Sequence, residues 1–292
     1  MKKQVILFCL LAISFSFCKA QYDPEYVDTK TAKIDGDEVN LVKMSRKGSR
    51  VKVKYFASRE NGKLVYSRYL EWARNKKIIA YSSGTYMNNC EDARIATPVG
   101  VCFDDGKLVN AQIKDQMDAL TIVYATGGIV ASNLKEGNLT VKESSSGNSK
   151  TLNLRNGFDF SSFKSWSGQE GATVFQTHLL YYKNNIAVGT NGSSTERERR
   201  VLAVCKDEDD NIIYYLINLA GNNTLYNATE KVSRFLLEKE FMDNIVFIIN
   251  LDTGCQNVFQ AYNSNGSELD GDGFNGKTPL SNASNLIVFY YE

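Results

Sequence analysis

The chain has 292 residues, with 34 Lys or Arg against 33 Asp or Glu, and 43% of its residues are hydrophobic. The near-neutral charge excludes a dedicated nucleic-acid binder, whose affinity would come from a basic excess. The hydrophobic fraction is that of a globular protein, and the length suits a single hydrophobic core, so one domain over residues 21–292 is predicted.

The N-terminus predicts a secretory signal peptide over residues 1–20. Lys2 and Lys3 precede an apolar run over 5–17, and Cys18 and Ala20 place small side chains before a cleavage site. That run is shorter than the roughly 20 apolar residues that span a membrane, and no later run reaches this length, so no transmembrane segment is expected. The alternative is a lipoprotein leader with Cys18 acylated. Either way, export to the periplasm, the cell surface or the medium is expected.

Short apolar runs bounded by Asn, Gly and Asp turns predict a strand-rich chain. The predicted strands cover residues 51–56, 77–81, 100–103, 120–124, 172–182, 201–205, 212–218, 245–251 and 286–291. The acidic stretch 206–211 is interpreted as a solvated hairpin turn between two of them and not as a metal site. The serine cluster over 143–150 predicts a flexible loop.

Two helices are predicted. A short one covers residues 67–75, and a longer one begins near Asn227, which would cap it while Glu230 completes a variant capping box. These elements together predict an α+β fold of curved, mostly antiparallel sheets with a few covering helices.

Four cysteines follow the leader: Cys90, Cys102, Cys205 and Cys255. Export allows disulfides, and four thiols permit three pairings that the sequence leaves open. Cys102 and Cys205 stand in apolar strand-like runs, which is typical of core residues, so at most one disulfide is expected. The chain contains no Cys-x-x-Cys pair and a single histidine, His178, so no metal site and no cofactor are expected.

Familiar catalytic signatures, such as a Gly-x-Ser-x-Gly elbow or a phosphate-binding glycine loop, are absent from the sequence. Between about residues 78 and 266, however, a series of segments resembles, in order, the phosphodiester glycosidase family, which includes an enzyme that removes N-acetylglucosamine from a phosphodiester. The segments are 78–87, 97–100 with 104–107, 175–180 with 183–184, 199–204, Gly221 with Thr224, and 249–256. The last of them resembles the family's Asn-Leu-Asp-Gly-Gly-Gly-Ser, with Thr253 and Cys255 in place of two glycines.

The residues around this last segment suggest a binding site independently of the family resemblance. The hydrophobic strand 245–249 is expected to carry Asn250 and Asp252 to its carboxyl end, where Thr253 and Gly254 form a loop open to a ligand. Asp252 is the predicted catalytic carboxyl group. Glycoside hydrolysis ordinarily uses two such groups, and Glu198, or failing that Glu196, is the second candidate.

The arginine run Arg197, Arg199 and Arg200 could offer a guanidinium group to a phosphodiester, and Arg200 is the predicted contact. Tyr86 is the candidate that would stack on a sugar ring. The resemblance implies an exported glycoside hydrolase that cleaves or binds a sugar-1-phosphodiester, with a glycan phosphodiester as its ligand and no nucleic-acid partner. The alternative is a non-catalytic protein on the same fold, which binds surface glycans or interacts with the cell envelope. The oligomeric state stays open.

Overall fold

A computed structural model of the chain describes residues 22–57, 64–89, 92, 95–190, 195–254, 256–269, 271 and 273–292. The predicted leader, with its alternative anchor Cys18, lies outside these residues, as do Cys90 and Cys255. Within the described residues, no helix combines the length and the apolar character that crossing a membrane requires.

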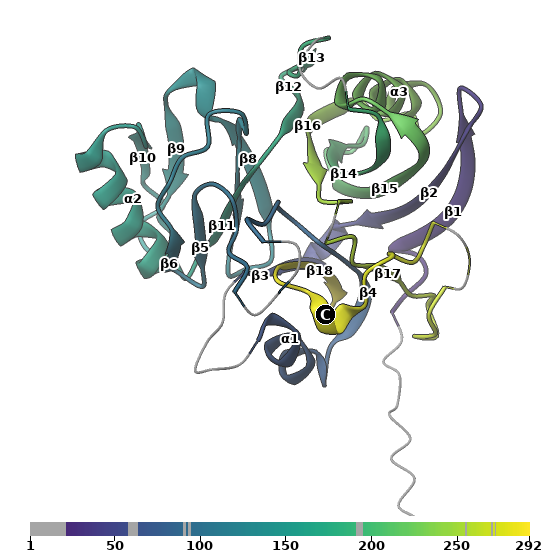
Figure 1. Cartoon of the computed structure of the whole chain (residues 1–292), viewed down its shortest axis with the longest axis horizontal. Helices are drawn as coiled ribbons and strands as arrows, with labels where there is room; N and C mark the ends of the chain where they lie inside the picture. Colours follow the sequence, from purple (N-terminus) through teal and green to yellow (C-terminus); the bar gives the residue numbers. More distant parts are fainter. Residues whose placement is uncertain are drawn as a thin grey trace, which may run out of the picture.

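A seven-stranded antiparallel sheet forms the largest layer (Figure 1). In spatial order its strands are β1 (Val27–Ile34), β2 (Asp37–Ser45), β15 (Ile212–Asn223), β14 (Arg197–Lys206), β16 (Asn244–Leu251), β12 (Leu179–Tyr182) and β13 (Asn185–Ile186). Asp35 and Gly36 connect β1 to β2 with φ angles of 51° and 88°, which two-residue hairpin turns of this kind require. Helix α3 (Leu225–Glu238) packs on one face of the sheet through residues such as Val232 and Leu236.

Two smaller sheets complete the architecture. The four-stranded sheet contains β17 (Phe259–Ala261), β4 (Lys77–Ser82), β18 (Leu286–Tyr291) and β3 (Val51–Phe56), and α1 (Val65–Ala73) packs beside it. The five-stranded sheet contains β6 (Lys107–Asn110), β5 (Cys102–Asp104), β11 (Thr173–Thr177), β7 (Ala119–Val123) and β8 (Ile129–Asn133). Next to the latter lie α2 (Gly157–Glu170) and the hairpin of β9 (Leu139–Lys142) and β10 (Ser149–Leu152). Three short 3-10 helices are η1 (Lys47–Ser49), η2 (Leu134–Glu136) and η3 (Leu280–Asn282).

One hydrophobic core is shared by all three sheets. Tyr55 of β3 stacks on Phe175 of β11 with ring centroids 4.3 Å apart, and both side chains are fully buried. Leu202 of β14 and Phe289 of β18 belong to the same core. Burial of this apolar surface is the main stabilising contribution, so the three sheets stabilise one another.

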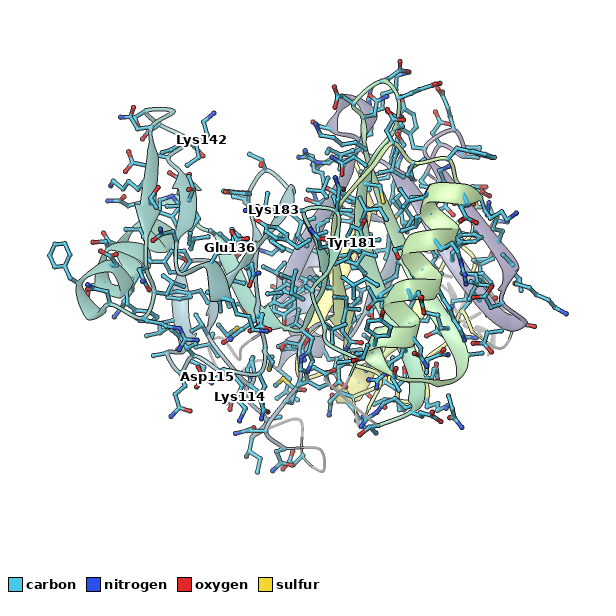
Figure 2. All side chains as sticks on the ribbon, turned by 90° about the horizontal axis from the view of Figure 1, so that it is seen from above. Lys114, Asp115, Glu136, Lys142, Tyr181 and Lys183 are labelled. Atoms are coloured by element: carbon cyan, nitrogen blue, oxygen red, sulfur yellow. The ribbon has the colours of Figure 1, made fainter. Side chains whose placement is uncertain are left out.

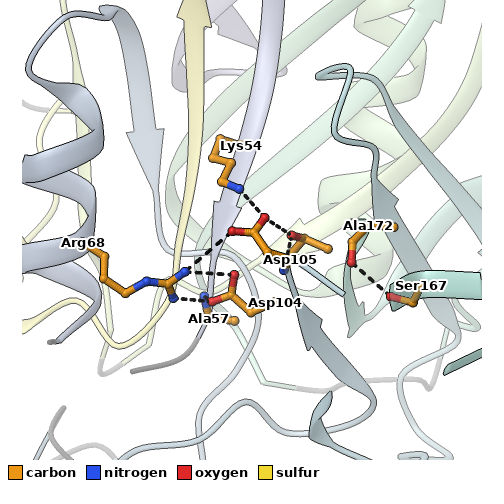
Figure 3. Close-up of polar contacts among 8 residues, drawn as sticks. Lys54, Ala57, Arg68, Asp104, Asp105, Ser167 and Ala172 are labelled. Atoms are coloured by element: carbon orange, nitrogen blue, oxygen red, sulfur yellow. Dashed lines mark hydrogen bonds and ion pairs between the residues drawn. The ribbon is translucent and has the colours of Figure 1, made fainter. Parts of the chain in front are cut away.

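Ion pairs also join elements of the fold, and burial distinguishes a strong one from a weak one. Arg68 of α1 donates through Nη1 to Oδ2 of the buried Asp104 at 2.6 Å, and the same carboxylate accepts the Ala57 amide at 2.9 Å (Figure 3). On the other side of the molecule, Lys183 Nζ and Glu136 Oε2 lie 2.8 Å apart, and Figure 2 shows the two side chains turned toward each other. Both lysine and glutamate are exposed there, so that pair contributes little.

Several predicted elements are confirmed. The two strands flanking residues 207–211 form the antiparallel hairpin of β14 and β15. Asp207 closes its turn by accepting the amides of Asp209 and Asn211 through Oδ1. Cys102 and Cys205 are buried free thiols, as expected of core residues.

Other expectations are corrected. The α+β class is wrong: the described residues are dominated by antiparallel strands and contain only three α-helices, so the protein is β-rich. The helix predicted near Asn227 begins at Leu225, because Thr224 is its cap and accepts the Asn227 amide through Oγ1 at 3.0 Å. The predicted strand 172–182 is broken at His178 into β11 and β12, which belong to different sheets.

Candidate functional site

Three segments meet at the carboxyl end of β16. Register places Arg200 of β14 opposite Leu251 of β16, so the first residues of β14 lie beside the loop that follows β16. Thr253 Oγ1 in that loop donates to the Glu198 carbonyl oxygen at 2.8 Å. The third segment is the turn after β4, where the Gly84 carbonyl oxygen accepts the Asp252 amide at 3.0 Å. We call the residues 250–254 the Asp252 loop.

Asp252 is the central carboxyl group of this loop. Its side chain is 2% exposed, and Oδ1 accepts the Gly254 amide at 2.8 Å. Burial raises the pKa of Asp252, although the Gly254 hydrogen bond and the charges of Arg200 and Arg197 act in the opposite direction. A carboxyl group that keeps its proton to higher pH is suited to act as a general acid.

Tyr86 and Asn250 lie next to this carboxyl group. Asn250 Nδ2 donates to Tyr86 Oη at 2.5 Å, and the Tyr86 ring meets the His178 ring edge-on at 5.4 Å between centroids. Burial and the charge of Asp252 raise the pKa of Tyr86 to about 12, so its hydroxyl stays protonated at neutral pH and remains a donor. Within the described residues, Asn250 Oδ1 has no hydrogen-bond partner.

The arginines are divided between the core and the surface. Arg200 is completely buried: Nη2 donates to Asn257 Oδ1 at 2.8 Å, and the guanidinium lies 4.2 Å from the centroid of the Phe259 ring. Burial lowers the pKa of Arg200 to about 10, so it still carries its charge at neutral pH. Because it is enclosed, Arg200 does not reach a ligand, and its predicted role as the phosphate contact is not supported by this geometry. Its charge acts on Asp252 from within the core instead.

Arg197 is the exposed arginine beside Asp252. A Cβ placed on Gly254 would lie 3.1 Å from Asp252 Oδ1 and 3.7 Å from Arg197 Nη1, so the two groups flank the same glycine. The remaining arginine of the run, Arg199, is buried and donates through Nε to the Asn223 carbonyl oxygen at 2.9 Å. The guanidinium available to an anion at this loop is therefore that of Arg197.

Glu198 faces a neighbouring space. Its carboxylate accepts from Asn218 Nδ2 at 3.1 Å and pairs with Lys277 Nζ at 3.0 Å. Burial opposes ionisation of Glu198, but the hydrogen bonds from Lys277 and Asn218 outweigh it and lower the pKa. Glu198 is joined to the Asp252 loop only through its backbone, and Glu196, the other candidate, is exposed. Within the described residues, no group of three or more His, Cys, Asp or Glu side chains is arranged to hold a metal ion.

The structure therefore brings Asp252 together with Asn250, Gly254 and Tyr86 from the predicted set, with Thr253 as the link to β14. Sequence reasoning missed Asn218 and Lys277. A signal for Asn218 was present, since it is a polar residue inside the apolar run of β15 and is 1% exposed. Lys277 carries no such signal, because it stands in a polar loop.

Comparison with known proteins gives limited results. No family model matches the sequence, and no curated protein matches it. Among solved structures, the chain is similar to the zebrafish N-acetylglucosamine-1-phosphodiester alpha-N-acetylglucosaminidase catalytic domain auto-inhibited by its pro-peptide, with a TM-score of 0.49 and 13% identity over 91% of this chain and 82% of that one. It is also similar to a hypothetical protein from Synechocystis, with a TM-score of 0.47 and 8% identity over 91% of this chain and 62% of that one. At TM-scores below 0.5, these similarities carry no inference about activity or ligand.

Proposed function

We propose that this chain is an exported protein that binds a sugar-1-phosphodiester at the Asp252 loop and hydrolyses the bond between the sugar and the phosphate. The observation that carries the proposal is the pairing of a buried carboxyl group of raised pKa, Asp252, with the exposed guanidinium of Arg197 across Gly254. The first group suits proton donation, and the second suits a phosphodiester anion. The resemblance of segments 78–87, 199–204 and 249–256 to the phosphodiester glycosidase family supports the same assignment, since all three meet at this loop.

The chemistry needs two carboxyl groups in different protonation states. Asp252, whose pKa is raised by burial, would donate a proton to the phosphate oxygen as the C1–O bond of the sugar breaks. Glu198, whose lowered pKa keeps it ionised, would accept a proton from the water that adds its hydroxyl to C1. The products are the free sugar and a phosphomonoester, and Asp252 regains a proton from Glu198 through solvent.

The test is sugar release from the methyl ester of N-acetylglucosamine-1-phosphate. Asp252→Asn is expected to abolish release without lowering the melting temperature, because the amide keeps the acceptor for the Gly254 amide but cannot donate the proton. Arg197→Met is expected to raise KM with a smaller effect on kcat, since its guanidinium would contact the anion. Turnover by Asp252→Asn at the rate of the unmodified protein would contradict the proposal.

One feature favours the non-catalytic alternative. Thr253 stands where the family resemblance has glycine, and its side chain is bound to the Glu198 carbonyl oxygen, while Asp252 exposes only 2% of its surface. A loop with a threonine side chain in place of bare backbone, and with its carboxyl group enclosed, can bind a glycan phosphodiester without cleaving it. Saturable binding of the same methyl ester, measured by calorimetry with no sugar released on prolonged incubation, would favour this second function over the first.

A further inference from the structure

A hollow of about 650 Å³ opens beside the first residues of β14, next to the Asp252 loop. We call it the Glu198 hollow. Strands β2, β14 and β15 line it, the last of them through residues 218 and 220–222, and the loop after β17 adds residues 271, 273 and 275–277. The side chains that matter to the argument are those of Glu38, Asn40, Glu198, Asn218 and Lys277.

At the hollow, the residues of the large sheet change from apolar to polar. Asn40 of β2 is paired with Asn218 of β15, and Asn218 with Arg200 of β14, so these three form one row across the sheet. The next row inward is Val42, Leu216 and Leu202, all fully buried in the shared core. A row of buried polar residues costs stability unless each finds a partner. Asn40 Oδ1 accepts from Thr31 Oγ1 at 2.6 Å and Arg200 donates to Asn257, so the question falls on Asn218.

Within the part of the chain that the structure describes, Asn218 has a side-chain oxygen that is left without a partner. It is 1% exposed, and its Nδ2 is used by the Glu198 carboxylate. Its Oδ1 has no hydrogen-bond partner among the residues that the structure describes. A buried amide oxygen without a partner destabilises the folded protein, and a ligand hydroxyl in the hollow would supply the missing hydrogen bond.

Glycines form much of the surface of the hollow, and two of them are required by packing: a Cβ would lie 1.8 Å from Asn40 Nδ2 at Gly273 and 2.2 Å from the Asn257 carbonyl oxygen at Gly276. Gly221, Gly271, Gly273 and Gly276 line the hollow, and three of these glycines have positive φ angles of 85°, 136° and 103°. At Gly271 no atom lies within 4 Å of an added Cβ, so there the bare backbone is open to a bound molecule. At the rim, Lys277 has a side chain that is 80% exposed and is held by Glu198.

The charges of the hollow exclude most classes of ligand. Among the described residues that line the hollow, Glu38 and Glu198 against Lys277 leave one net negative charge, which disfavours an anion. Lys277 already neutralises Glu198, and the part of the chain that the structure describes contains no group of three or more His, Cys, Asp or Glu side chains placed to hold a metal ion. Carboxylate, amide and ammonium groups together match a molecule that both donates and accepts hydrogen bonds and carries no charge.

We propose that the Glu198 hollow binds a neutral sugar ring, with the ring hydroxyls donating to Asn218 Oδ1 and Glu198 and accepting from Lys277. This inference rests on the proposed function in one respect, since it places the sugar half of the phosphodiester in the hollow and the phosphate at Arg197. The binding of a free sugar to the hollow does not itself require catalysis.

The experiment titrates the protein with free N-acetylglucosamine, mannose, glucose and galactose, and follows backbone amide resonances by NMR. At least one sugar is expected to bind with a Kd of about 1 mM and to shift the amides of Gly221, Gly273 and Gly276. Absence of any such shift for all four sugars would overturn the inference.

Variants locate the binding. Asn218→Leu is expected to weaken sugar binding about tenfold, or about 1.4 kcal/mol, because it removes the unpartnered oxygen. Lys277→Gln, a surface change that does not threaten folding, is expected to weaken it as well. Lys183→Gln is the matched control, since it also removes an exposed lysine paired with a glutamate, but far from the hollow, and binding should not change. Equal affinity in Lys277→Gln and Lys183→Gln would contradict the inference.

Different results would contradict the proposed hydrolysis and the proposed sugar site. Asp252→Asn leaves the hollow intact and is expected to bind the free sugar as the unmodified protein does. Sugar binding without any cleavage of the methyl ester would contradict the proposed hydrolysis and support the sugar site in the hollow. Cleavage that is unaffected by Lys277→Gln, with no binding of free sugar, would contradict the sugar site in the hollow and support the proposed hydrolysis.

Discussion

At the scale of single residues, the candidate site is built from charges that burial makes costly. Asp252 and Arg200 are both removed from water, and burial raises the pKa of the first and lowers that of the second. Each shift means that the folded protein holds the charged form less readily than the unfolded chain does. A site of this kind lowers the free energy of unfolding, which is common where residues are arranged for function.

Asp252→Asn tests that exchange through stability. The pKa of Asp252 in the folded protein is raised above its ordinary value of 3.8. The free energy of unfolding therefore falls as pH rises from 3.8 to the raised pKa, because the unfolded chain ionises Asp252 first. Above the raised pKa the free energy of unfolding stays lower by the same amount. The neutral variant is therefore expected to be more stable than the unmodified protein at neutral pH, with the difference vanishing in acid. Urea denaturation at a series of pH values measures this. A less stable variant at neutral pH would mean that the carboxylate is not destabilising.

Gly254 is the residue whose missing side chain matters most. A Cβ there would lie 3.1 Å from Asp252 Oδ1, tighter than nine in ten real Cβ contacts, and 3.7 Å from Arg197 Nη1. Gly254→Ala should displace both groups and lower kcat/KM for sugar release by about 10- to 100-fold, the effect of a small misplacement of reacting groups. Gly157→Ala is the control, because no atom lies within 4 Å of the added Cβ, and it should leave kcat/KM unchanged.

At the scale of elements, local signals decided where helices begin, but not always through the expected residue. Helix α3 is capped by Thr224 and not by Asn227. Helix α2 was missed although Asn156 caps it by accepting the amides of Phe158 and Asp159. Its sequence is rich in Ser and Gly, and only Phe163, Trp166 and Ser167 are buried, so no strong helical periodicity marks it.

The assignment of the α3 cap can be tested directly. Thr224→Ala removes the acceptor for the Asn227 amide and is expected to lower the free energy of unfolding by about 1 kcal/mol. Asn227→Ala should change it by only a few tenths of a kcal/mol, because Asn227 is exposed inside the helix and alanine is the better helix former. Chemical denaturation of both variants compares them. If Asn227→Ala were the more destabilising variant, the cap would be misassigned.

At the scale of the whole molecule, the shared core predicts that the three sheets unfold together. The stack of Tyr55 on Phe175 joins the four-stranded sheet to the five-stranded one, and the core continues into the seven-stranded sheet. No boundary of exposed, polar contacts separates these layers at that point. The chain is therefore expected to behave as a single domain over its described residues, as its length suggested.

Phe175→Ala is the test of that expectation. Loss of a fully buried ring is expected to cost about 3–5 kcal/mol and to shift one cooperative calorimetric transition to lower temperature. Phe158→Ala removes a phenylalanine that is 79% exposed and should change stability by less than about 0.5 kcal/mol. Two transitions, of which Phe175→Ala moves only one, would show that the layers are separate domains.

The sequence by itself located much of the strand framework. Runs of β-branched and aromatic residues between turn residues identify β3, β4, β14, β15, β16 and β18, because that pattern reflects the local geometry of a strand. It also identified the carboxyl end of β16, with Asn250, Asp252 and Gly254, as a candidate site. It failed for β1, which is largely exposed or half-buried and carries Asp28, Lys30 and Lys33, and for β2, and it therefore underestimated the share of strand in the fold.

Only the tertiary structure decided which groups face one another. The register of β14 shifts between Arg197 and Arg199, so simple alternation along the strand does not tell which arginine turns inward. Pairing with β15 and β16 encloses Arg200, leaves Arg197 at Gly254, and directs Glu198 toward Asn218 and Lys277. Strand pattern is a property of neighbouring residues, whereas the space that a side chain enters depends on which distant segments cover it.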